Sequence, residues 1–351
     1  MGDRDNRDPL HGVTLEAVLK EMLARHGWAG LGRSIKVRCF LNEPSVKSSL
    51  AFLRKTPWAR KKLEAWYVYE LSRGPKAGPA PKPVEPSIAG VARTALEALG
   101  VKGGLEAAAA PANPRVLDLV PPGGIKKLLI YAPDAIGRRM ALIHPELFAG
   151  IDAAGFRKID LRSVYPSKTP VCFASMFSGL MPAGHGIKQY EKPALKCRTI
   201  FDALPAAGFK TAIAAVKDSS MDLIFRGRAA DYFSEEYDPQ VTDRALALLE
   251  AGAHDVILAY HQEYDDLLHK AGPWKDEAVA AVARHTEAFL RLAAAAKERW
   301  KGVPHGILFA PDHGAHTDPA TGRGVHGDDI PADMNVTHYW KFRRGQGDGA
   351  L

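Results

Sequence analysis

Residues 163–187 read SVYPSKTPVCFASMFSGLMPAGHGI, and this stretch decides the fold of the larger part of the chain. A proline directly after Thr169 is tolerated in the first turn of a helix, where its missing N–H costs nothing. The stretch predicts a helix from Val171 to Ser178, with Thr169 as N-cap and Gly179 as C-terminal stop. A hydroxyl there faces free N–H groups and the positive end of the helix dipole, which suits a phosphoryl group. An ordinary capping threonine is the alternative.

Short apolar runs surround this stretch and alternate with helical patterns. The runs at 127–132, 211–216, 255–260 and 306–310 are typical of buried parallel strands. Between them, the residues at 199–207, 242–251 and 276–301 repeat at helical spacing. This alternation predicts an α/β domain with a mostly parallel sheet flanked by helices.

Length and charge divide the chain into parts. At 351 residues it is too long for one typical domain. Up to Arg73 it has 14 Lys and Arg against 8 Asp and Glu, whereas the remainder has 33 against 32. We therefore predict a basic helical domain at 1–73, a linker rich in Pro, Ala and Gly at 74–124, and a second domain at 125–351.

The chain has the composition of a cytoplasmic protein. Its longest apolar runs are far below the roughly 20 residues of a membrane span, so we expect no membrane association. The charged start MGDRDNRD leads us to expect no signal peptide. The three cysteines are odd in number and widely spaced, which favours reduced thiols in a cytoplasm.

The first domain shows three helical patterns. One ends at Gly27, a second runs from Ser45 through Leu53, and a third follows Thr56. The third is expected to bury Trp58, Leu63, Trp66 and Tyr67. Cationic residues beside aromatic ones are the footprint of phosphate-backbone contact, and a solvated charged face is the alternative. The candidate nucleic-acid-binding residues are Lys47, Arg54, Lys55, Arg60, Lys61 and Lys62.

A family resemblance covers nearly all of this domain. PLHGVTLEAVLKEML and NEPSVKSSLAFLRKTPWARKK, within residues 9–71, resemble the "VF five-thirty" family, a small bacterial family of DNA-binding proteins. The resemblance implies a small all-α fold and double-stranded DNA as the partner.

Carboxylates and imidazoles come after successive predicted strands of the second domain. Because parallel strands bring their carboxyl ends to one edge of the sheet, we expect these side chains to gather there. Taken singly, each has an ordinary explanation as a helix cap or core residue, but their joint placement indicates a site for two metal ions. Mixed Asp and His ligation suits Zn²⁺, with Mn²⁺ as the alternative, better than Mg²⁺ or Ca²⁺. The candidate residues are Asp134, Thr169, Asp265, His269, Asp312, His313 and His326.

The motifs around these residues resemble the alkaline phosphatase superfamily, closest to its type I phosphodiesterase/nucleotide pyrophosphatase branch. The resemblance covers about 126–344 and rests on the threonine segment ending in His-Gly-Ile, on Asp-x-x-x-His before Gly-Pro, on Asp-His-Gly and on a late His-Gly. It implies one metal held by Asp134, Thr169, Asp312 and His313, and the other by Asp265, His269 and His326. It also implies that Thr169 is the nucleophile and forms a covalent phospho-threonine.

One position departs from the family pattern. The nucleotide-processing branch usually has an asparagine three residues after the nucleophile, where this chain has Cys172. A thiol is a poor substitute for an amide donor. We therefore predict a two-metal phosphoric ester hydrolase of phosphodiesterase type, acting on a phosphorylated small molecule or nucleotide, with a nucleic-acid-binding module. The alternatives are a phosphomonoesterase, a phosphonate hydrolase and a non-catalytic DNA-associated binding protein.

Overall fold

The computed structural model describes residues 14–41, 44–72 and 86–345, which form two compact units. The first unit ends at Val84 and the second begins at Glu85. In the described ranges, every helix is too short or too polar to cross a bilayer. Residues 74–85 of the expected linker lie outside the described residues.

The first unit is helical, as expected. Thr14 caps its first helix by accepting a hydrogen bond from the N–H of Ala17, and Ser45 caps the third by accepting one from Ser48. Gly27 interrupts the first helix with a φ of 62°, a left-handed conformation that glycine adopts without strain. The helices are α1 (Leu15–Ser34), α2 (Arg38–Leu41), α3 (Val46–Lys55) and α4 (Pro57–Ser72).

The expected burial of Trp58 is wrong. Its side chain is 57% exposed, whereas Leu63 and Tyr67 are buried. The buried stripe of α4 runs through Ala59, Leu63 and Tyr67, which succeed one another at the i, i+4 spacing of one helix face. Trp58 is one residue out of register with this stripe and faces outward.

The second unit is built on a seven-stranded sheet of order β2-β9-β6-β1-β5-β3-β4. The five strands from β6 to β4 are parallel, and β9 runs antiparallel to both β6 and β2. The expected mostly parallel α/β architecture is confirmed, although β2, β4 and β9 were not predicted. The strands are β1 (Lys127–Pro133), β2 (Arg157–Arg162), β3 (Thr211–Val216), β4 (Asp231–Glu235), β5 (Val256–His261), β6 (His305–Phe309) and β9 (Asn335–Arg343), with a separate hairpin of β7 (His316–Thr317) and β8 (Gly324–Val325).

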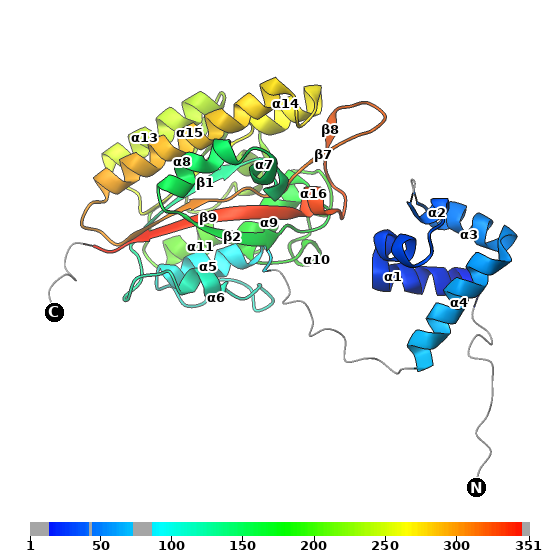
Figure 1. Ribbon diagram of the computed structural model, residues 1–351. Helices are drawn as coiled ribbons and strands as arrows, with labels where there is room; N and C mark the ends of the chain where they lie inside the picture. The colour runs from blue at the N-terminus through cyan, green and yellow to red at the C-terminus, as the bar shows by residue number, and fades with distance from the viewer. Residues whose placement is uncertain (1–13, 42–43, 73–85, 346–351) are drawn as a thin grey trace, which may run out of the picture. The chain divides into compact units, whose positions relative to one another are not determined.

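Helices cover both faces of this sheet (Figure 1). Successive strand residues alternate between two apolar cores: Leu128 and Ile130 of β1 enter one core, and Leu129 and Tyr131 the other. The first face carries α5 (Gly90–Ala98), α6 (Pro114–Leu117), α9 (Thr169–Ser178), α11 (Ile200–Ala206) and α12 (Ser220–Ile224). The second carries α7 (Arg138–Ile143), η1 (Pro145–Phe148), α8 (Ala149–Ala153), α13 (Asp238–Ala251), α14 (Glu263–Ala271) and α15 (Asp276–Arg299). The remaining short helices are α10 (Pro182–His185) and α16 (Pro331–Met334).

The expected linker extends too far along the chain. Residues 86–124 belong to the second unit, because Ile88, Val91 and Leu96 are buried in its core. The N–H of Ile88 also donates to the carbonyl of Arg162, the last residue of β2. Pro and Gly in this segment interrupt regular structure but leave its many apolar residues free to pack.

Helix α9 forms where the sequence predicts it, with one shift. Its N-cap is Lys168, so Thr169 is the first helical residue and not the cap. Gly179 ends the helix with a φ of 79°, as expected. All ten residues of α9 are buried, which fixes Thr169 firmly inside the second unit.

Candidate metal centre

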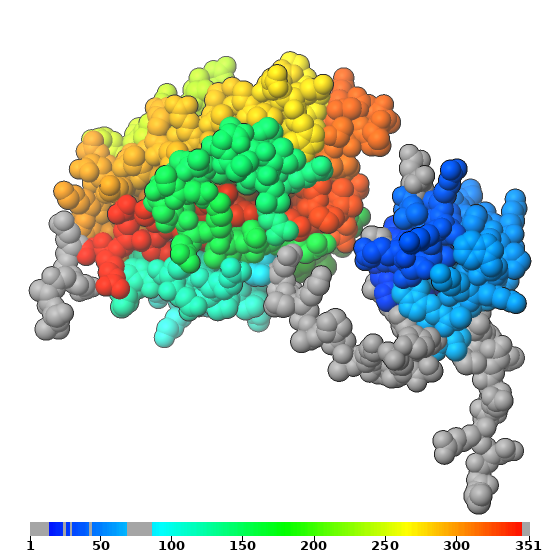
Figure 2. All heavy atoms as spheres, viewed as in Figure 1, coloured from blue at the N-terminus to red at the C-terminus, as the bar shows by residue number. Residues whose placement is uncertain are grey.

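The carboxyl ends of the strands bring all seven predicted site residues together. Asp134 directly follows β1, and Asp312 and His313 follow β6. Asp265 and His269 lie one turn apart on α14, which follows β5. His326 directly follows β8, in a hairpin that contacts α14 and lies beside it in Figures 1 and 2.

The first group contains Asp134, Thr169, Asp312 and His313. The Thr169 hydroxyl oxygen lies 3.3 Å from both Asp134 Oδ1 and His313 Nε2. His313 Nε2 lies 3.4 Å from Asp134 Oδ1 and 3.3 Å from Asp312 Oδ2. All four side chains are almost fully buried.

The second group contains Asp265, His269 and His326. Asp265 Oδ1 lies 3.4 Å from Nε2 of each histidine, and the two Nε2 atoms are 3.1 Å apart. The rings of His313 and His326 stack with their centroids 4.1 Å apart. The two groups are therefore adjacent halves of one site.

Backbone carbonyls fix which ring nitrogen of each histidine faces the site. The Nδ1 atoms of His269, His313 and His326 lie 2.9, 3.0 and 2.8 Å from the carbonyl oxygens of Gly324, Gly314 and Ser167. Since a carbonyl only accepts, each Nδ1 carries the proton. All three Nε2 atoms then point lone pairs into the site, the arrangement that metal-binding histidines adopt.

Burial and mutual repulsion make this collection of charges unfavourable by itself. Burial raises the pKa of Asp134 well above its usual range, and repulsion by Asp312 adds to this effect. Burial also raises the pKa of Asp312 to about 7 and lowers that of His313 well below its usual range. A divalent cation would stabilise the ionised carboxylates and the neutral imidazole together.

In the second group, Asp265 and His326 shift each other's pKa. Burial would raise the pKa of Asp265, but attraction by His326, whose Nε2 lies 3.4 Å from Asp265 Oδ1, outweighs it and lowers that pKa. Burial likewise opposes the charge on His326, but Asp265 raises its pKa. A divalent ion bound between these residues would supply the positive charge that Asp265 attracts.

Two further observations show that the residues fit a pair of metal ions. Asp265 Oδ1 and Asp312 Oδ2 are buried carboxylate oxygens that accept no hydrogen bond from the described residues. Ligands about 2.0–2.1 Å from a tetrahedral zinc ion lie about 3.3 Å from one another. The donor distances in both groups, 3.1–3.4 Å, agree with this spacing.

Neighbouring groups hold the first-group carboxylates in place. The Tyr260 hydroxyl donates to Asp134 Oδ2. The N–H of Ala135 donates to Asp312 Oδ1 at 3.2 Å, and the Ser163 hydroxyl donates to the Asp312 carbonyl. Ala135 has a φ of 60°, a left-handed conformation that glycine adopts without strain.

Asp333 holds the loop that carries His326. Its Oδ2 accepts the N–H groups of Gly327 and Asp328, each at 3.0 Å, and its Oδ1 lies 2.8 Å from His316 Nδ1. The carboxylate is fully buried. His316 thus pairs with Asp333 and supports the loop, which agrees with a structural role for this histidine.

Cys172 does not take over the role of the family's asparagine. Its side chain is fully buried, and its sulfur lies 3.2 Å from the Ser163 hydroxyl oxygen. Burial raises the pKa of the thiol well above its usual range. The thiol is therefore neutral and belongs to the packing between α9 and the Asp312 segment.

A small polar cavity of about 110 Å³ opens over Thr169. Lys192 and Lys217 line it together with Tyr190, whose ring is 59% exposed. The Lys192 ammonium lies 5.4 Å from the centre of the Tyr190 ring. The sequence analysis did not identify these three residues.

Asp238, His261 and His285 also lie close together, but they form a hydrogen-bond network and not a metal site. His285 Nε2 accepts the N–H of Tyr264, so its Nδ1 carries the proton and donates to Tyr131. The Tyr131 hydroxyl can then donate to His261 Nδ1 at 2.8 Å. Asp238, the nearby carboxylate, accepts two backbone N–H groups. No nitrogen lone pair in this group is left for a metal.

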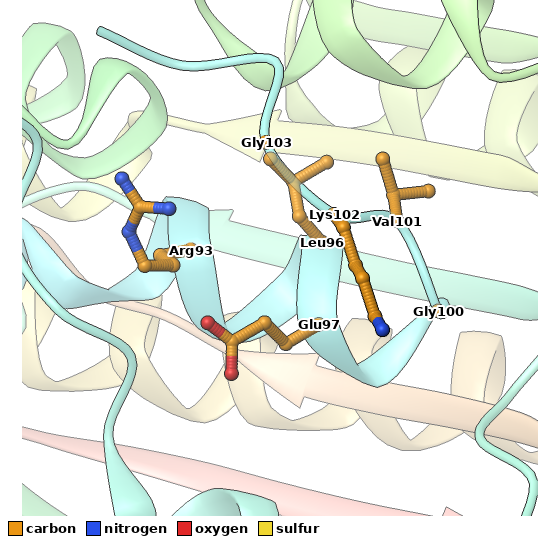
Figure 3. A pocket seen from close by; sticks show the side chains of 7 residues that line it. All are labelled: Arg93, Leu96, Glu97, Gly100, Val101, Lys102 and Gly103. Carbon is orange, nitrogen blue, oxygen red and sulfur yellow. The ribbon is translucent and has the colours of Figure 1, made fainter. Parts of the chain in front are cut away.

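A larger hollow of about 450 Å³ lies at the C-terminal end of α5 (Figure 3). Leu96 and Val101 give it an apolar wall, and Arg93 and Glu97 project from the same helix. It shares no lining residue with the metal centre, and its lining residues form no catalytic constellation. We assign no chemistry to it.

The first unit presents the six cationic residues named from the sequence. Lys47, Arg54, Lys55, Arg60, Lys61 and Lys62 are all exposed on α3 and α4. Arg60 pairs with Glu64 at 2.8 Å. Arg54, Lys55, Lys61 and Lys62 come from the segment where α3 leads into α4, and Lys47 lies at the start of α3.

Two family models match the chain. The model described as type I phosphodiesterase / nucleotide pyrophosphatase matches residues 151–347, more than half of the chain, and the one described as DNA-binding protein VF530 matches residues 6–68. Six of the seven site residues fall in the first range, and Asp134 precedes it. No curated relative matches the chain.

Several solved structures are similar to the second unit. Murine ectonucleotide pyrophosphatase / phosphodiesterase 5, in complex with AMP, is 16% identical, with a TM-score of 0.46 over 56% of this chain and 59% of that one. Phosphonoacetate hydrolase from Sinorhizobium meliloti 1021 is 18% identical, with a TM-score of 0.40 over 54% and 57%. The C-terminal periplasmic domain of phosphoethanolamine transferase EptC from Campylobacter jejuni is 13% identical, with a TM-score of 0.47 over 62% and 80%. The chain thus spans less than two thirds of the first two proteins.

Proposed function

Since this chain belongs to the type I phosphodiesterase / nucleotide pyrophosphatase family, we propose that its second unit is a two-metal hydrolase of phosphoric diesters, with Thr169 as nucleophile. The observation that carries the proposal is that three histidine Nε2 atoms and three carboxylates gather in two adjacent groups, the first of which contains the Thr169 hydroxyl. Such a set of unprotonated donors requires positive charge. Asp134, Thr169, Asp312 and His313 would hold one ion, and Asp265, His269 and His326 the other.

Each part of the site then has a chemical task. Bound zinc ions would supply Lewis acidity, which polarises the phosphoryl oxygens and favours the ionised threonine oxygen. The Thr169 oxygen attacks phosphorus, the bond to the leaving oxygen breaks, and phospho-threonine forms. Water then attacks the same phosphorus and restores the threonine hydroxyl. Burial of Thr169 in α9 holds its oxygen in position through both steps.

The cavity over Thr169 supports an anionic substrate with a planar group. Lys192 and Lys217 supply positive charge at its lining, and the exposed face of Tyr190 can stack on a base. The N-terminus of α9 adds the positive end of a helix dipole at the same place. With Cys172 in place of asparagine, these groups would bind the phosphoryl oxygens without a side-chain amide.

For the first unit we propose nucleic-acid binding. Its support is the exposed cationic surface on α3 and α4 and the match of residues 6–68 to a DNA-binding family. The phosphate backbone of nucleic acid attracts such surfaces irrespective of sequence. The unit would thereby hold a polynucleotide substrate on the same chain as the hydrolase.

The test of the hydrolase is turnover of p-nitrophenyl phosphate, bis(p-nitrophenyl) phosphate and a nucleotidyl p-nitrophenyl diester by the zinc-loaded chain. We expect faster turnover of the diesters, and its loss in Asp312→Ala. Asp152→Ala, which removes an exposed carboxylate from α8, is the matched control and should retain full activity. Preference for the monoester would assign a phosphatase instead, and no turnover with two metals bound would contradict the hydrolase.

A further inference from the structure

We infer that the first unit binds an unpaired nucleic-acid strand, with the indole of Trp58 stacked on a base. This inference rests on the nucleic-acid role proposed for this unit and replaces the duplex partner that the sequence resemblance implies. It starts from the outward position of Trp58, which the helix pattern did not predict.

Among the tryptophans of the first unit, Trp58 is the exposed one. Its side chain is 57% exposed, whereas Trp28 and Trp66 of the same unit pack against the apolar core. A large aromatic side chain in water leaves much apolar area unburied, so an exposed one often marks a binding surface. Here the exposed area is a flat ring at the start of α4.

Cationic residues lie within four positions of Trp58 in the chain, both before and after it. Lys61 and Lys62 come three and four residues after Trp58 on the same helix, so they share its face. Arg54 and Lys55 end α3 four and three residues before it, and Figure 1 shows α3 and α4 joined at one corner of the unit. All four cationic side chains are exposed.

An aromatic platform inside a cationic surface matches single strands better than duplexes. Proteins that bind single strands combine phosphate contacts with aromatic side chains on which unpaired bases stack. In a duplex the bases stack on each other, so their faces are not available to an indole. A protein that contacts only the phosphates of a duplex gains nothing from an exposed aromatic ring. Trp58 would therefore discriminate in favour of an unpaired strand.

The metal centre independently favours the same substrate. Thr169 and Asp312 are 3% and 0% exposed, and the cavity over Thr169 holds only about 110 Å³. A flexible single strand or strand end can present a phosphodiester to such a recessed oxygen. A rigid duplex cannot bring a phosphodiester to this oxygen, because its phosphates lie on the surface of a helix that is too wide to enter the cavity.

The test is fluorescence anisotropy of labelled oligothymidine of about 20 nucleotides and of duplex DNA of about 20 base pairs. Both probes are longer than the roughly 4–16 nucleotides that a small single-strand-binding domain covers. The full chain is kept free of divalent metal by a chelator so that neither probe is cleaved. Four variants are compared: Trp58→Ala, Trp58→Phe, the double variant Lys61→Ala/Lys62→Ala, and Leu142→Ala, which truncates an exposed apolar side chain on α7 as a control.

We expect tighter binding to oligothymidine than to duplex. Trp58→Ala should weaken oligothymidine binding about tenfold or more and leave duplex binding unchanged, while Trp58→Phe, which keeps a ring, should retain most of it. The lysine double variant should weaken both probes and flatten their salt dependence, and Leu142→Ala should change neither.

Two outcomes separate this inference from the proposed function. Equal binding to both probes, or equal loss on both in Trp58→Ala, overturns the stacking inference and leaves nucleic-acid binding in place. Failure to bind either probe at low salt overturns both.

Discussion

The hydroxyl oxygen of Thr169 lies 3.3 Å from Nε2 of His313, although the two residues are 144 positions apart in the chain. Thr169 comes from the first turn of α9, and His313 from the end of β6. The His313 ring also stacks on His326 of the second group. The proposed nucleophile is therefore part of the first metal-binding group and borders the second.

Replacing Thr169 by alanine should abolish turnover while leaving the metal content near that of the unchanged chain. The remaining donors Asp134, Asp312 and His313 stay in place, but no oxygen is left to attack phosphorus. Thr169→Ser, which keeps a hydroxyl, should retain measurable activity. Steady-state kinetics and elemental analysis on the same samples check both points. Undiminished turnover in Thr169→Ala would exclude this residue as the nucleophile.

Replacing His326 by alanine should remove one of two bound metal equivalents. The second group would keep only Asp265 and His269, while the first group loses no donor. Metal content after dialysis, measured by mass spectrometry, should fall from about two ions per chain to about one. His144→Ala removes a histidine paired with Glu146 on the surface and should leave the content unchanged. The same content in both variants would contradict the assignment of His326.

Replacing Asp333 by alanine should weaken metal binding about 10–100-fold, as loss of supporting hydrogen bonds around metal ligands typically does. The N–H groups of Gly327 and Asp328 would lose their acceptor, and the loop carrying His326 would no longer be fixed. Asp333→Asn keeps an oxygen for these two groups and should be milder. Competition with a zinc-binding dye measures the affinities. Equal affinity in Asp333→Ala and the unchanged chain would show that Asp333 does not position His326.

Replacing Ala135 by glycine should change stability little. The left-handed conformation, with a φ of 60°, costs alanine about 1–2 kcal/mol, and glycine adopts it freely. That gain roughly offsets the loss of a buried methyl group, about 0.8 kcal/mol, and the greater freedom of glycine in the unfolded chain. Ala281→Gly, at a buried position inside α15, lacks the compensation and should destabilise by about 1 kcal/mol or more. Urea unfolding distinguishes the two, and equal losses would argue against strain at Ala135.

Stability should fall with acid between about pH 6.5 and pH 4, in part through His185. Burial lowers the pKa of His185 in the folded protein to about 4, from an ordinary value near 6.5. Between these values the unfolded chain binds a proton that the folded chain does not, so stability drops as the pH falls. The ring is held neutral by the Ile187 N–H, which Nδ1 accepts, and by the Ser175 hydroxyl oxygen, 2.9 Å from Nε2.

His185→Asn tests this contribution, because asparagine can still accept the Ile187 N–H. Urea unfolding at several pH values should give a slope smaller by roughly one proton in this variant than in the unchanged chain. An unchanged slope would show that His185 does not titrate in this window.

Local patterns in the sequence were enough to predict four of the seven strands of the sheet and to single out the candidate metal-binding residues. Strands such as β1 and β3 are continuous apolar runs because both faces of a central parallel strand are covered. Edge strands lack this signal, since β2 exposes half of its residues, and it was missed. Candidate residues such as Asp134 and Asp312 were recognisable because parallel strands place the residues at their carboxyl ends along one edge of the sheet.

Tertiary structure decided the rest, since it depends on which surfaces meet. Trp58 faces outward because the core of the first unit contacts the face of α4 that carries Ala59 and Leu63. The apolar residues of α4 lie on more than one face, so the helical pattern alone does not decide which face is buried. Lys192 and Lys217 reach the cavity over Thr169 because loops far apart in the sequence converge there. The sequence by itself thus determined the central strands β1, β3, β5 and β6 and the candidate metal-binding residues, which depend on local periodicity and spacing. Only the tertiary structure decided the distances between these residues, the tautomers of the histidines and which residues line the cavity over Thr169, because these arise from long-range contacts.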